Sequence, residues 1–155
     1  MFGNKTIADM KYGSDEQQSL QLKKILSKPD SFFPTPDMVL AVYSDKCMIY
    51  RLKTDCEHLQ RIHYGAKIVE SWSLSIMISA IPPFILVDKD DNCVVPGKYN
   101  LHICPGGKEF LSNVYYADEC GNKLPEFDFY DKELLDAVFL MIMHVDLTMD
   151  YWRRT

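Results

Sequence analysis

The chain has 155 residues, a formal net charge of -5 and a pI of about 5.3, and its residues are 47% apolar and 25% charged. This is the composition of a globular protein and excludes a largely disordered chain. Adjacent lysine or arginine residues occur only as two single pairs, so we do not expect nucleic acid as a direct ligand.

The sequence contains no segment that predicts insertion into a membrane. Its longest apolar runs, at residues 81–87 and 137–143, are far shorter than the ~20 residues of a membrane-spanning helix. The first ten residues also lack the apolar core of a signal peptide. The five cysteines are irregularly spaced, which argues against a disulfide framework. We therefore expect an intracellular (cytoplasmic) protein or one within a virion, not a secreted one.

The first half of the chain predicts one helix followed by strands. Ser14 begins a capping-box pattern, and residues 17–28 are rich in helix-favouring residues. Short apolar runs at 38–43 and 47–52, separated by a polar turn, predict two paired strands. Apolar side chains alternate with serines over 72–80, which predicts a half-buried strand.

The second half predicts antiparallel hairpins, because short apolar segments are separated by turn residues. The expected strands cover residues 84–87, 98–104, 110–117 and 124–129. Strict alternation over 143–151 predicts a further strand, whereas 132–142 fits either a helix or a strand.

Together these elements predict an α+β fold, mainly antiparallel β, whose sheet curls toward a sandwich or barrel with one or two flanking helices. We expect a single domain over residues 1–155. Within it, 1–30 form an N-terminal arm and helix, and 38–155 form a β-rich body.

Candidate chemical groups are sparse. Cys56, His58 and His63 are potential zinc ligands, and His102 with Cys104 would complete a set, but their spacing is not that of a usual zinc site. Scattered core cysteines and surface histidines are the favoured interpretation. The local sequence also favours no particular cysteine and histidine as a catalytic nucleophile and base. We therefore expect no metal site, no cofactor and no catalytic residues.

The sequence also suggests residues for a protein interface. Aromatic and arginine side chains dominate the binding energy of protein interfaces, and several of them cluster at 151–154. The candidate interface residues are Tyr151, Trp152, Arg153, Arg154 and Trp72.

Two segments resemble strands of the tail tube proteins of contractile-tailed phages. Residues 70–77, which include Glu70 and Trp72, are similar to the central strand of that family, and 145–152 resemble its closing strand with a terminal aromatic pair. The resemblance implies a β-barrel-like subunit without catalytic residues. In such proteins the edge strands pair around a six-fold ring, and the rings stack into a hollow tube. One departure is Pro82-Pro83, where the family carries a helix.

The expected function is a non-enzymatic structural subunit of a self-assembling particle, such as a phage tail or other virion component. Its partners would be further copies of itself or other subunits of the particle. The alternative is a small intracellular protein-binding accessory or inhibitor protein that acts as a monomer or dimer.

Overall fold

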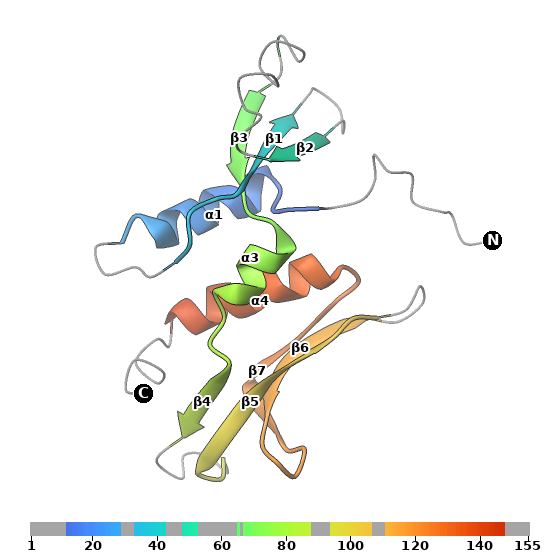
Figure 1. The fold of residues 1–155 in the computed structure, drawn as a ribbon. Helices are drawn as coiled ribbons and strands as arrows, with labels where there is room; N and C mark the ends of the chain where they lie inside the picture. Colours follow the sequence, from blue (N-terminus) through green and yellow to red (C-terminus); the bar gives the residue numbers. More distant parts are fainter. Residues whose placement is uncertain are drawn as a thin grey trace, which may run out of the picture. The chain divides into compact units, whose positions relative to one another are not determined.

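The computed structural model (Figure 1) describes residues 12–28, 33–42, 48–52, 65, 67–87, 94–106 and 111–147, and only the backbone of 48–52 and 146–147. The chain forms two compact units, Met1–Ala80 and Ile81–Thr155, which we call unit 1 and unit 2. The single domain over 1–155 stays a prediction.

Unit 1 contains a three-stranded antiparallel sheet in the order β2-β1-β3, with helix α1 against β3. Its described elements are α1 (Glu16–Leu26), β1 (Met38–Val42), β2 (Met48–Leu52), β3 (Lys67–Ser71) and α3 (Leu74–Ser79). The core includes Leu22 and Ile25, which lie one helical turn apart on α1, and Val39, Leu40 and Ala41 of the central strand.

The first helix begins one residue later than the sequence pattern suggests. Asp15, not Ser14, is the N-cap: its side chain accepts a hydrogen bond from the Gln18 backbone at 2.8 Å, and the Gln18 side chain accepts one from the Asp15 backbone at 3.1 Å. This is a complete capping box. Ser14 is displaced from that role because its hydroxyl is used in the contact described next.

The segment before α1 is joined to the end of β3 by a buried polar contact, which we call the seam (Gly13, Ser14, Ser19, Ser71 and Trp72). The Ser14 hydroxyl accepts a hydrogen bond from the Trp72 backbone at 3.0 Å, and it lies 2.7 Å from the Ser19 hydroxyl and 3.2 Å from that of Ser71. Ser71 also donates to the Ser14 carbonyl at 2.7 Å. Gly13 is required here, since a Cβ would lie 2.9 Å from the Trp72 carbonyl oxygen.

The predicted strand over 72–80 is wrong, because residues Leu74–Ser79 form the short helix α3. Ser73 is its N-cap, and the Ser73 hydroxyl accepts a hydrogen bond from the Ile76 backbone at 3.3 Å. The alternating serines that suggested a strand therefore include a capping residue. Asp37 fixes the same turn by accepting a hydrogen bond from the Ser73 backbone at 2.8 Å.

Unit 2 contains a four-stranded antiparallel sheet in which neighbours in the sequence are also neighbours in space, in the order β4-β5-β6-β7. The described elements are β4 (Phe84–Val87), β5 (Gly97–Cys104), β6 (Ser112–Ala117), β7 (Lys123–Asp131) and α4 (Leu134–Leu147). The sheet is strongly curled (Figure 1). The predicted hairpins over 84–129 are thus confirmed, with small shifts at their ends.

Helix α4 packs on β6 and β7 and closes the core of unit 2. The buried residues Val138, Met141, Ile142 and Val145 stand at positions i, i+3, i+4 and i+7, as on one face of a helix. The predicted strand over 143–151 is therefore wrong as far as Leu147, because the helical spacing continues through the alternating residues. Residues 148–151 lie outside the described part of the chain.

The β7 strand contains a large irregularity. Ala117 and Tyr115 of β6 oppose Lys123 and Asp128 of β7, so five residue steps on β7 (128 − 123) match two on β6 (117 − 115). Residues 124–127 form this bulge, which bends the strand locally.

The α+β class with mainly antiparallel sheets and flanking helices is confirmed. The described residues form seven strands and three helices, of which α3 is the helix that the sequence did not predict.

Candidate functional site: the outer face of the four-stranded sheet

Seven side chains on the face of the β4–β7 sheet opposite the core form one connected group, which we call the outer face. Val114 and Tyr116 of β6 point into the core, so Asn113 and Tyr115 point the other way. Directly paired residues of antiparallel strands share a face. The register therefore defines two rows, Cys104–Asn113–Tyr130 and His102–Tyr115–Asp128, and the contacts described next add Lys123 to them.

Lys123 is the centre of this group. Its Nζ donates hydrogen bonds to Asn113 Oδ1 and to the Tyr130 hydroxyl, each at 2.9 Å, and lies 3.6 Å from Asp128 Oδ1. The same ammonium lies 4.2 Å from the ring centre of Tyr115 and 5.1 Å from that of Tyr130. The bulge makes these contacts possible, because it shortens the distance between the two ends of β7.

The neighbours of Lys123 are themselves fixed. Asn113 Nδ2 donates to Asp128 Oδ1 at 2.8 Å and to the Phe129 carbonyl at 2.9 Å. The His102 ring stacks on Tyr115, with 5.0 Å between ring centres and 10° between the ring planes. The outer face is thus a connected set of hydrogen bonds and ring contacts, with Tyr130 still 50% exposed.

The electrostatics of the site hold both Lys123 and Tyr115 in their protonated forms. The hydrogen bond with Tyr130, followed by the Asp128 carboxylate, raises the pKa of Lys123. Burial, followed by the Cys104 thiol, raises the pKa of Tyr115. A lysine nucleophile or a tyrosine base needs a lowered pKa instead, so neither group is prepared for such chemistry near neutral pH.

The described residues offer no cluster of three His, Cys, Asp or Glu side chains that could hold a metal ion. His102 and Cys104 lie two residues apart on β5, and both are exposed. The other candidate ligands, Cys56, His58 and His63, lie outside the described residues.

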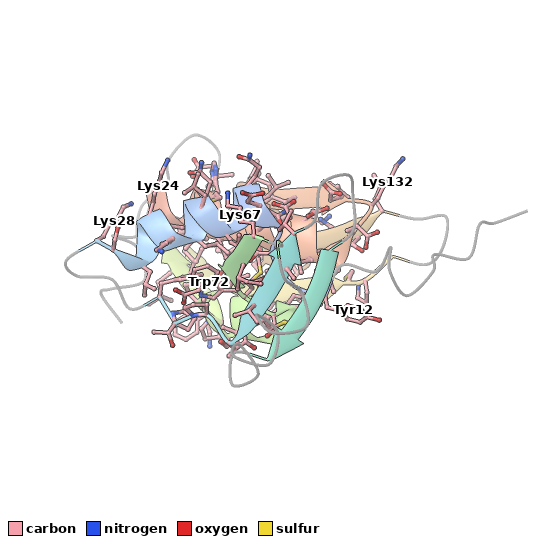
Figure 2. All side chains as sticks on the ribbon, turned by 90° about the horizontal axis from the view of Figure 1, so that it is seen from above. Tyr12, Lys24, Lys28, Lys67, Trp72 and Lys132 are labelled. Carbon is pink, nitrogen blue, oxygen red and sulfur yellow. The ribbon has the colours of Figure 1, made fainter. Side chains whose placement is uncertain are left out.

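Of the predicted interface residues, only Trp72 lies in the described part of the chain. Tyr151, Trp152, Arg153 and Arg154 lie outside the described residues. Trp72 is 1% exposed, and its indole Nε1 donates to the Pro34 carbonyl at 2.8 Å. Figure 2 shows Lys24 and Lys28, by contrast, projecting outward from α1. In this structure Trp72 is a core residue and presents no surface to a partner.

The outer face was not predicted from the sequence. Alternation in 98–104 and 110–117 already places His102 with Cys104, and Asn113 with Tyr115, on the polar sides of their strands. Which polar sides lie next to each other depends on the strand register, and the position of Lys123 depends on the bulge in β7. Neither follows from a local sequence pattern.

Among the described helices, none combines the length and hydrophobicity required to cross a membrane. Comparison of the sequence with models of known protein families, with curated proteins and with solved structures finds no match.

Proposed function

We propose that the protein is a non-enzymatic, protein-binding subunit of a larger assembly, and that the outer face is its contact surface. The observation that carries the proposal is the fixed and exposed cluster around Lys123. Tyrosine is enriched among the residues that dominate binding energy at protein interfaces. Side chains that are already held in place lose less conformational freedom on binding, which favours affinity.

The same geometry favours a protein over a nucleic acid as the partner. The Tyr115 ring already contacts the His102 ring and the Lys123 ammonium, so it is not a free platform for stacking a base. The charge of Lys123 is partly balanced by Asp128 at 3.6 Å, which weakens attraction to phosphates.

The proposal does not extend to a tail tube. Both segments that resemble the tube family contain helix in the described residues, at Leu74–Ser79 and up to Leu147. The proposed assembly role rests on the outer face instead.

The test is the assembly state of the untagged protein, measured by light scattering coupled to size-exclusion chromatography, with negative-stain microscopy of each peak. We expect oligomers whose dissociation constant rises at least tenfold in Tyr130→Ala, the loss typical of an interface hot spot. Val95→Ala is the matched control, because Val95 is also in unit 2 and is 62% exposed.

Equal assembly of both variants would overturn the role of the outer face. A monomer at every concentration would overturn self-assembly and favour the accessory-protein alternative. Circular dichroism of each variant excludes unfolding as the cause of a change.

A further inference from the structure

The two edge strands of unit 2 line a common apolar pocket. In a flat sheet β4 and β7 would be three strand spacings apart, about 14 Å. The curled sheet instead brings them to opposite walls of one pocket of about 40 Å³. Its lining includes Ile85, Val87, Leu124, Glu126 and Phe127.

The free edge of β4 is suited to accept another strand. The Leu101 backbone donates to the Pro83 carbonyl at 2.9 Å, and hydrogen-bonded pairs alternate along an antiparallel ladder. The backbone groups of Ile85 and Val87 therefore face β5, whereas those of Phe84 and Leu86 face the free edge. None of the described residues pairs with that edge. The opposite wall is the β7 bulge, where Pro125 lacks a backbone donor.

The last turn of helix α4 lies close to a residue that lines this pocket. The His144 ring lies 5.3 Å from that of Phe127, which lines the pocket. Leu147 ends the helix only three residues later, about 4.5 Å along its axis. Residues 148–155 follow, and eight extended residues span up to about 26 Å.

The chemistry of 148–155 fits the pocket and its rim. Met149 and Tyr151 alternate with Thr148 and Asp150, so an extended chain over these residues would carry its apolar side chains on one face. Arginines at 153 and 154 complement the exposed carboxylate of Glu126. We infer that residues 148–155 of the same chain bind along the free edge of β4 and place an apolar side chain in the pocket between β4 and β7.

This docking does not involve the outer face. Its test measures backbone amides of β4 and not the assembly state of the protein. Amide hydrogen exchange by NMR is compared between the full chain and a chain that ends at Leu147. The Phe84 and Leu86 amides are expected to exchange at least tenfold more slowly in the full chain. The Ile85 and Val87 amides, which face β5 in both chains, are the internal control.

A second variant covers the case in which the shortened chain does not fold. Met149→Asp combined with Tyr151→Asp in the full chain is expected to remove the protection of Phe84 and Leu86 equally. A synthetic peptide of residues 148–155, added to the shortened chain, is expected to restore the protection, and a scrambled peptide is not.

Two results would overturn the inference. One is equal exchange of Phe84 and Leu86 in the full chain and both variants. The other is protection that disappears on dilution, since that would assign the bound segment to a second copy of the chain.

Discussion

Replacement of Ser14 by alanine tests whether the seam holds unit 1 together. Ser14→Ala leaves the Trp72 backbone N–H without its acceptor at 3.0 Å, in a place where Ser14 and Ser71 are both fully buried. Ser19 keeps the Ser14 carbonyl as a partner at 3.3 Å. One unsatisfied buried donor costs about 1–3 kcal/mol, so we expect the free energy of unfolding of unit 1 to fall by about 2 kcal/mol.

The assay is urea unfolding followed by tryptophan fluorescence, together with exchange of the Trp72 amide. With a denaturant slope of about 2 kcal/mol per M, the unfolding midpoint is expected to fall by about 1 M. Ser79→Ala is the control, because its hydroxyl makes one exposed hydrogen bond, to the Ile76 carbonyl at 2.6 Å. A loss for Ser14→Ala no larger than that for Ser79→Ala would refute the role of the seam.

Two further predictions concern unit 2. Tyr116→Phe leaves the Pro82 carbonyl without the buried hydroxyl that donates to it at 2.6 Å, and is expected to cost about 1 kcal/mol in thermal or chemical unfolding; unchanged stability would contradict that contact. The pKa of Asp118 lies below its ordinary value of 3.8, mainly because the Asn122 backbone donates to the carboxylate. Its contribution to the β6–β7 turn is therefore complete above about pH 4 and is lost as the pH falls through the lowered pKa. NMR shifts of the Gly121 amide are expected to titrate below 3.8 and to lose this transition in Asp118→Asn, and a midpoint at or above 3.8 would contradict the prediction.

The hairpins of unit 2 were predictable because their signals are local. The proline, glycine and asparagine residues between the apolar runs fix where each strand ends, and antiparallel neighbours need only short connections. The strand over 84–87 was predicted with the bounds that β4 has. Strand β3, at Lys67–Ser71, was missed because its isolated apolar pair, Ile68 and Val69, shows no alternation.

The wrong strand over 72–80 and the wrong part of the strand over 143–151, up to Leu147, share one physical cause. Over 72–80 and 143–151, apolar residues alternate with polar ones, but alternation in a short window also fits a helix. In α3 the deciding contact is the Ser73 cap, and in α4 it is the burial of Val138, Met141 and Val145 against the sheet. Neither the local cap of α3 nor the tertiary burial of α4 is visible in a period-two pattern.

The contacts of the candidate site depend even more than the two helices on interactions that the local sequence does not reveal. Lys123 reaches Tyr130 because four residues of β7 bulge out between Lys123 and Asp128. The pKa of Lys123 rises mainly because its ammonium is hydrogen-bonded to Tyr130. Neither the bulge nor the resulting contacts follow from residue types near Lys123 alone.

The seam also sets how long α1 stays without its packing partner during synthesis. Ser14 and Ser71 are 57 residues apart, so α1 leaves the ribosome well before the strand against which it packs. At about 5–20 residues per second this delay is roughly 3–11 s. In unit 2, by contrast, each strand pairs with the one made just before it, and α4 covers strands that already exist. Among the described elements, nascent α1 therefore waits longest for its partner, and it is the one that a chaperone would be expected to meet first.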